Sequence, residues 1–150
     1  NNLRLLKAFV KSADQIPNLS FNLKITISKT PETEKVMLNA PKNLTVDFLG
    51  SLSRVDVIDE ISKSKFLIFP SLTESFGLPL IEGCQLGCYV ICSDLPYVHE
   101  IIRPSLTFDP YSVHSISKLI NQSLQDKNLI FTKMKIESAT QLILNEITNV

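Results

Sequence analysis

The chain of 150 residues lacks the features that mark several classes of protein. It has no tryptophan, and its 15 basic and 15 acidic side chains leave no excess of either charge. Without a basic surface or many aromatic residues, nucleic acid is not an expected partner. No apolar run approaches the roughly 20 residues that span a bilayer, and no signal peptide opens the chain. The expected location is therefore cytoplasmic.

Glycine and cysteine are also scarce. The chain has four glycines and contains neither a GxGxxG nor a Walker-type phosphate loop. The cysteines are Cys84, Cys88 and Cys92, four residues apart. A metal site would need further ligands, and the nearest histidine, His99, lies beyond a proline. We therefore expect small buried core residues in a reducing compartment, and no metal.

The length and composition indicate one globular domain. A chain of this size can bury roughly two thirds of its unfolded surface, and 44% of its residues are hydrophobic. Residue Asn1 already lies inside a helical pattern, without an initiator methionine. The expectation is a single domain over 1–150 that is a fragment of a longer protein.

Short apolar strands alternate with helical patterns along the chain. Helices are predicted over 2–16, 31–38, 53–63, 78–86, 97–102, 112–125 and 128–147. Strands are predicted over 21–27, 44–49, 66–69, 89–92 and 106–108. This alternation predicts an α/β fold, a doubly wound, Rossmann-like parallel sheet flanked by helices. Ligands of such sheets bind beyond the carboxyl ends of the strands.

The most informative stretch is FLIFPSLTESFGLPLIE, residues 66–82. A buried strand ends here, Glu74 opens a turn, and a helix that starts at Leu78 carries Glu82. The start of that helix presents unpaired N–H groups and partial positive charge, which suit a diphosphate. Gly77 has no Cβ, so we expect that an anion can approach its backbone. The two carboxylates can accept hydrogen bonds from sugar or ribose hydroxyls.

Spacing alone leaves other interpretations open. Glu82 would then be a solvated helix residue, and Glu74 a loop charge favoured by the nearby helix dipole. A glycoside hydrolase could use the pair as acid and nucleophile, but such a site does not call for a glycine corner and a helix end. His99 and His114 are placed by no motif, so ordinary structural positions are expected for both.

Three segments carry a resemblance to a known family: FPSLTESFGLPLIE (69–82), GCYVICSDLPYVHEII (87–102) and FDP (108–110). They resemble the C-terminal domain of GT-B glycosyltransferases, specifically the large retaining family GT4 of many sucrose, lipopolysaccharide and capsule transferases. The resemblance implies a domain that binds a nucleotide-diphosphate sugar donor for transfer, with retention, to a glycan or lipid-linked acceptor. The acceptor would bind an N-terminal domain that is missing here, so the isolated fragment is expected to be inactive.

The resemblance also implies roles for individual residues. Glu74 would contact hydroxyls of the donor sugar and is the candidate catalytic residue. The candidate donor-binding residues are Ser75, Phe76, Gly77, Leu78 and Glu82. Among these, Glu82 would bind the ribose, and the bend before it would supply backbone contacts to the diphosphate. Ser75 stands where the family often has glycine.

Family members generally need no metal, and no cofactor besides the donor is expected. Their basic pair, an Arg and a Lys, precedes the helix that begins at Asn2 and is absent here. Asp94 and Glu100 match recurrent family positions, and we interpret both as loop and helix-end structure. Peripheral association of the full-length protein with the inner face of a membrane is left open. The alternative function is a non-catalytic interaction domain of a glycan assembly complex.

Overall fold

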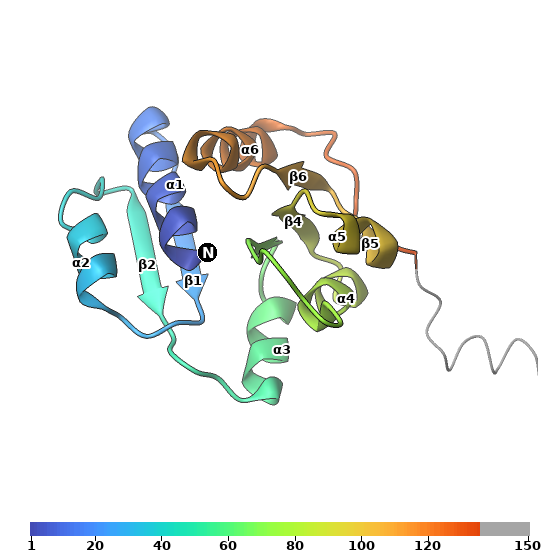
Figure 1. The fold of residues 1–150 in the computed structure, drawn as a ribbon. Helices are drawn as coiled ribbons and strands as arrows, with labels where there is room; N and C mark the ends of the chain where they lie inside the picture. Colours follow the sequence, from blue (N-terminus) through green and yellow to red (C-terminus); the bar gives the residue numbers. More distant parts are fainter. Residues whose placement is uncertain (136–150) are drawn as a thin grey trace, which may run out of the picture.

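Helices and parallel strands alternate along residues 1–135, the part of the chain that the computed structural model describes (Figure 1). The helices are α1 Asn2–Gln15, α2 Pro31–Met37, α3 Arg54–Ser62, α4 Leu78–Gln85, α5 Pro96–Ile101 and α6 Val113–Gln125. The strands are β1 Phe21–Ile25, β2 Leu44–Phe48, β3 Phe66–Phe69, β4 Tyr89–Ser93, β5 Ile102–Arg103, β6 Leu106–Phe108 and β7 Lys133–Met134. The predicted α/β class, with parallel sheets flanked by helices, is confirmed.

The strands that carry the fold pair in parallel. Strand β1 pairs with β2, from Phe21 opposite Leu44 to Ile25 opposite Phe48. A second sheet has the order β3-β4-β6. The crossovers β1–β2, β3–β4 and β4–β6 contain helices α2, α4 and α5, as parallel connections require. In the described residues, hydrogen bonds therefore join the parallel strands as two sheets.

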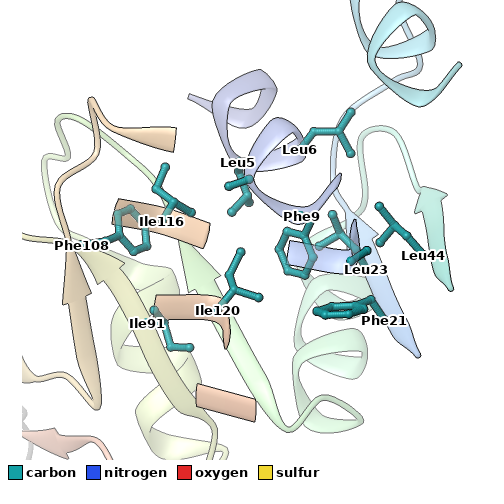
Figure 2. Packing of buried hydrophobic residues seen from close by; sticks show 12 residues of the cluster. Leu5, Leu6, Phe9, Phe21, Leu23, Leu44, Ile91, Phe108, Ile116 and Ile120 are labelled. Carbon is teal, nitrogen blue, oxygen red and sulfur yellow. The ribbon is translucent and has the colours of Figure 1, made fainter. Parts of the chain in front are cut away.

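One hydrophobic cluster joins the two sheets beneath α1 and α6 (Figure 2). Its labelled members are Leu5, Leu6, Phe9, Phe21, Leu23, Leu44, Ile91, Phe108, Ile116 and Ile120. A second cluster lies on the other face of β4, where Val90 and Cys92 meet Leu80, Val98, Ile101 and Ile102. Strand β4 is therefore apolar on both faces because helices cover both, which is the physical meaning of double winding.

Local sequence signals begin and end the helices around the sheet edge. Ser53 accepts a hydrogen bond from the Asp56 amide at 3.2 Å and so caps α3. Gly87, with φ +77°, follows the end of α4, and the amide of the next residue donates to the Gly83 carbonyl at 2.9 Å. A Cβ on Gly83 would lie 2.5 Å from Leu67, so this glycine serves close packing.

The predicted helix over 128–147 is wrong for its described part. Strand β7 pairs antiparallel with β5, and residues 128–135 are not helical. Thr132 Oγ1 accepts from the Val90 amide at 2.8 Å, and the Phe131 ring stacks on Tyr89 at 4.1 Å between centroids. These tertiary contacts overrode the helical periodicity of the apolar residues. Residues 136–150 lie outside the described part.

The predicted placement of the cysteines in the core is confirmed. Cys88 and Cys92 are buried, Cys84 is half-buried, and all three are free thiols. Burial, with a smaller contribution from the Asp94 charge, raises the pKa of Cys92 to about 12. Within residues 1–135 no group of three or more His, Cys, Asp or Glu side chains is placed to hold a metal ion. No helix in this same range combines the length and apolar character needed to cross a bilayer.

Candidate functional site

The candidate site is the bend that joins β3 to α4. Glu74, Ser75 and Phe76 are exposed on it, and 77% of the Phe76 surface is accessible. The bend closes at Gly77, which adopts the left-handed conformation with φ +59° and ψ +35° and precedes the first residue of α4. The bend therefore lies beyond the carboxyl end of a parallel strand, where this fold class binds its ligands.

The backbone amides of the bend are unused. The Gly77 carbonyl accepts from the Leu80 amide at 2.9 Å and from the Ile81 amide at 3.4 Å, which closes the first turn of α4. The amides of residues 74–78 have no hydrogen-bond partner among the described residues. Unpaired amides and the positive end of the helix dipole together favour an anion at this position.

The packing around Gly77 explains why a glycine occupies this position, and this explanation differs from the one that the sequence suggested. Gly77 is buried, and a Cβ on it would lie 2.7 Å from Ile101 Cδ1 and 3.3 Å from Leu80 Cδ1. The space on the Cβ side is therefore filled by the core, and no anion can approach from there. Glycine is required by the positive φ and by this packing, so an anion would have to approach the Gly77 backbone from another side.

Glu82 points from α4 toward the start of α3. Its Oε1 lies 3.0 Å from Nη2 of Arg54, and its side chain is only 13% exposed. A solvated helix residue would be far more exposed, so that interpretation of Glu82 is wrong. Arg54 was not among the residues predicted for the site, although its place as the first residue of α3, directly after the Ser53 cap, was a usable signal.

Tyr97 on α5 holds the loop that leads to Glu74. Its hydroxyl donates to the Ser71 carbonyl at 3.2 Å. Burial raises the pKa of Tyr97, and the nearby Cys92 and Glu74 raise it further. Sequence reasoning assigned Tyr97 only to a helical turn and could not see this contact.

The remaining candidate residues have structural positions. Asp94 Oδ1 lies 2.6 Å from His99 Nε2, directly after β4, while Glu100 is exposed on α5. Their expected loop and helix-end positions are confirmed. His114 Nδ1 lies 3.3 Å from the Lys11 amine on the surface. Neither histidine contacts the bend in any hydrogen bond of the described residues.

The bend thus offers three kinds of group within one connected segment. Unpaired amides can receive a phosphate-like anion, an exposed carboxylate at Glu74 can accept from hydroxyls, and a mostly buried carboxylate at Glu82 lies one turn into the helix. This combination suits a ligand with hydroxyls on both sides of a strongly anionic centre.

Comparison with known proteins identifies relatives of this sequence. The chain is 34% identical over 82 residues to O-antigen chain mannosyltransferase B of Escherichia coli, an alignment that covers 54% of this chain and 22% of that protein. It is 30% identical over 95 residues to the serotype-specific mannosyltransferase WbdA of Escherichia coli, covering 63% of this chain and 12% of that protein. The chain therefore matches about a fifth or less of the length of these relatives.

Solved structures show the same fold. The pneumococcal O-GlcNAc transferase GtfA, crystallised with UDP and GlcNAc, matches with a TM-score of 0.59 at 18% identity, over 97% of this chain and 29% of that one. An annotated UDP-N-acetylglucosamine 2-epimerase from Listeria monocytogenes matches with a TM-score of 0.59 at 15% identity, over 84% of this chain and 33% of that one. The family model of the glycosyl transferases group 1 matches residues 3–142. Because that model spans nearly the whole chain, the chain belongs to the glycosyl transferases group 1 family and has the architecture of a GT-B C-terminal domain.

Proposed function

We propose that the protein carrying this chain is a retaining glycosyltransferase and that this chain binds its nucleotide-diphosphate sugar donor. The observation that carries the proposal is the bend at 74–78, whose amides are unpaired and which lies between Glu74 and Glu82. The diphosphate would lie against these amides and the start of α4. Charge that develops on the departing diphosphate is what such a site must stabilise.

The two carboxylates have separate parts in the proposal. Glu74, exposed on the loop that Tyr97 supports, would accept hydrogen bonds from hydroxyls of the donor sugar. Glu82 would accept from the ribose, and its burial beside Arg54 supports a fixed orientation. Ser75, Phe76, Gly77 and Leu78 would provide backbone contacts. The proposal calls on no metal and no further cofactor.

The acceptor is proposed from the relatives. One of them is named an O-antigen chain mannosyltransferase and the other a serotype-specific mannosyltransferase, so a glycan or lipid-linked acceptor of the lipopolysaccharide type is the class we propose. Donor binding would be the part that this chain performs, and the acceptor would meet the donor outside residues 1–150. Peripheral membrane association of the complete protein belongs to the same proposal.

Titration calorimetry of the complete protein with UDP, GDP, ADP and their sugar derivatives tests donor binding. Charge-assisted hydrogen bonds are worth about 1.5–3 kcal/mol, so Glu82→Gln should weaken binding of the bare nucleotide by roughly 10- to 150-fold. Glu74→Ala should leave the bare nucleotide unaffected and remove the preference for the sugar-bearing form.

Equal affinities for sugar nucleotide and bare nucleotide, in wild type and Glu74→Ala alike, would contradict this division. Absence of nucleotide binding by the wild-type protein would instead favour the non-catalytic interaction domain.

A further inference from the structure

Arg54 forms an ion pair that the sequence did not predict. Its Nη2 lies 3.0 Å from Oε1 of Glu82, and the two residues come from different helices, α3 and α4. The Glu82 side chain is 13% exposed, while that of Arg54 is 68% exposed. A long cationic side chain therefore reaches from the surface to a mostly buried carboxylate.

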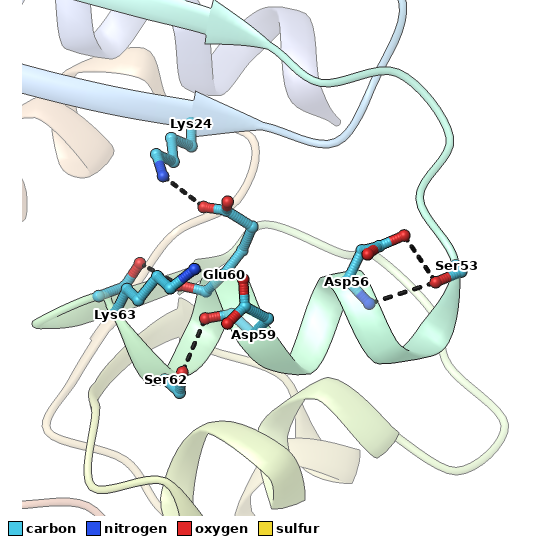
Figure 3. Close-up of polar contacts among 8 residues, drawn as sticks. Lys24, Ser53, Asp56, Asp59, Glu60, Ser62 and Lys63 are labelled. Carbon is cyan, nitrogen blue, oxygen red and sulfur yellow. Dashed lines mark hydrogen bonds and ion pairs between the residues drawn. The ribbon is translucent and has the colours of Figure 1, made fainter.

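Stability of α3 does not explain an arginine at this position. Arg54 is the first residue of the helix, where the positive end of the dipole disfavours a cation. The favourable interactions at that end come from others: Ser53 caps the helix, and Asp56 places a carboxylate in its first turn (Figure 3). Because 68% of the Arg54 side chain is exposed, solvent screens its charge, and the contribution of this contact to folding is reduced accordingly.

The pair leaves half of the carboxylate available. Arg54 is placed on Oε1, and Oε2 of Glu82 has no hydrogen-bond partner among residues 1–135. In that part of the chain, the buried and unpaired side-chain oxygens belong to Ser93 and Asn121, so Oε2 is not sealed in the core. The attraction of the guanidinium for Oε1 favours one orientation of the carboxylate and so limits where Oε2 can lie.

We propose that Arg54 is a positioning and specificity residue: it orients Glu82 so that the free carboxylate oxygen selects the ribose hydroxyls of the donor nucleotide. The inference rests on the proposed function, since it concerns the same donor site. It adds a residue from α3, the helix that connects β2 to β3. It also proposes that the ion pair is what distinguishes ribose from deoxyribose.

The test compares two ligands in the complete protein. Calorimetry would measure the bare diphosphate that the wild type binds best among UDP, GDP and ADP, and its 2′,3′-dideoxy counterpart. Arg54→Gln should weaken binding of the ribonucleotide about tenfold and leave the dideoxy form within twofold, so that the preference disappears. Arg54→Lys should retain part of the preference, because an ammonium pairs without the planar fork.

Two controls separate positioning from general effects of charge. Lys63→Gln removes an equal charge from the end of the same helix, where Lys63 pairs with Asp59 (Figure 3), and should leave the preference unchanged. In a Glu82→Gln background, Arg54→Gln should have no further effect on the preference, because the oriented group is already neutral. Melting temperatures of the variants report whether each one folds.

Several results would overturn the inference. An equal loss for both ligands in Arg54→Gln would mean that Arg54 acts through net charge, and tighter binding would mean that it competes with the ribose. Wild-type protein that binds a nucleotide but shows no preference for ribose would refute the inference alone. Wild-type protein that binds none of the diphosphates would refute the proposed function itself, which is a separate result.

Discussion

Substitution of Gly77 by alanine would test how the bend is built. The new Cβ would lie 2.7 Å from Ile101 Cδ1, and the backbone would have to keep φ at +59°. The left-handed conformation costs a residue with a side chain about 1–2 kcal/mol, and an additional methyl in a filled core costs about 1–3 kcal/mol. Gly77→Ala should therefore lower the free energy of unfolding by about 2–5 kcal/mol.

Gly87→Ala is the matched control for this substitution. Gly87 also has a positive φ, +77°, but a Cβ there would meet nothing within 4 Å. Only the cost of the left-handed conformation applies at this position, so the free energy of unfolding of Gly87→Ala should fall by about 1–2 kcal/mol. Urea-induced unfolding followed by far-ultraviolet circular dichroism measures both variants.

The clash itself can be isolated with Ile101→Val, which removes the Cδ1 atom that the new Cβ would meet. In the wild type this change should cost about 0.5–1.5 kcal/mol. In the Gly77→Ala background it should cost nothing or stabilise the protein, because it relieves the overlap. Additive effects of the two substitutions, or equal losses in Gly77→Ala and Gly87→Ala, would refute the packing argument.

Two further predictions concern stability. The pKa of Cys92 is about 12 in the folded protein, against 9.0 for the free thiol. The contribution of Cys92 to the free energy of unfolding is therefore fully present below pH 9, and above pH 9 it falls by about 1.4 kcal/mol per pH unit. Between pH 8 and 10, Cys92→Ala should therefore lose about 1.4 kcal/mol less than wild type in urea titrations; identical losses would contradict this. The Asn43 amide donates to three carbonyls in the last turn of α1 and the segment that follows it, those of Ala13, Ile16 and Leu19. Asn43→Ala should lower the free energy of unfolding by about 1–3 kcal/mol. The control Asn39→Ala, at an exposed position, should lower it by less than about 0.5 kcal/mol. Equal losses in the two variants would refute the prediction for Asn43.

Sequence patterns predicted the elements that depend on short-range signals. The strand Phe66–Phe69 has the predicted bounds, and the helix that follows it begins at the predicted Leu78. Both are marked by residues that lie beside them in the chain, an apolar run closed by proline in one case and a Gly-Leu-Pro sequence in the other. Helix α2 also has the predicted start, but its reciprocal cap between Thr30 and Thr33 was not anticipated.

The prediction failed where distant residues decided the conformation. Apolar periodicity after residue 128 predicted a helix, but Thr132 and Phe131 bind to β4 instead. Spacing could not distinguish the two outcomes, because the partner atoms belong to residues about 40 positions earlier in the chain. The candidate site has the same limitation, since the Tyr97 contact and the Arg54 pair also join separate elements.

The sequence by itself determined the order of the parallel strands and of helices α1 to α6, the apolar character of both faces of β4, and the corner that carries Glu74 and Glu82. These follow from period, capping and turn chemistry, which act over a few residues. Only the tertiary structure decided that the Cβ side of Gly77 is filled by Ile101 and that Glu82 is turned toward Arg54. Such contacts depend on how α3, α4 and α5 pack around the sheet, and no local pattern encodes the distance between two helices.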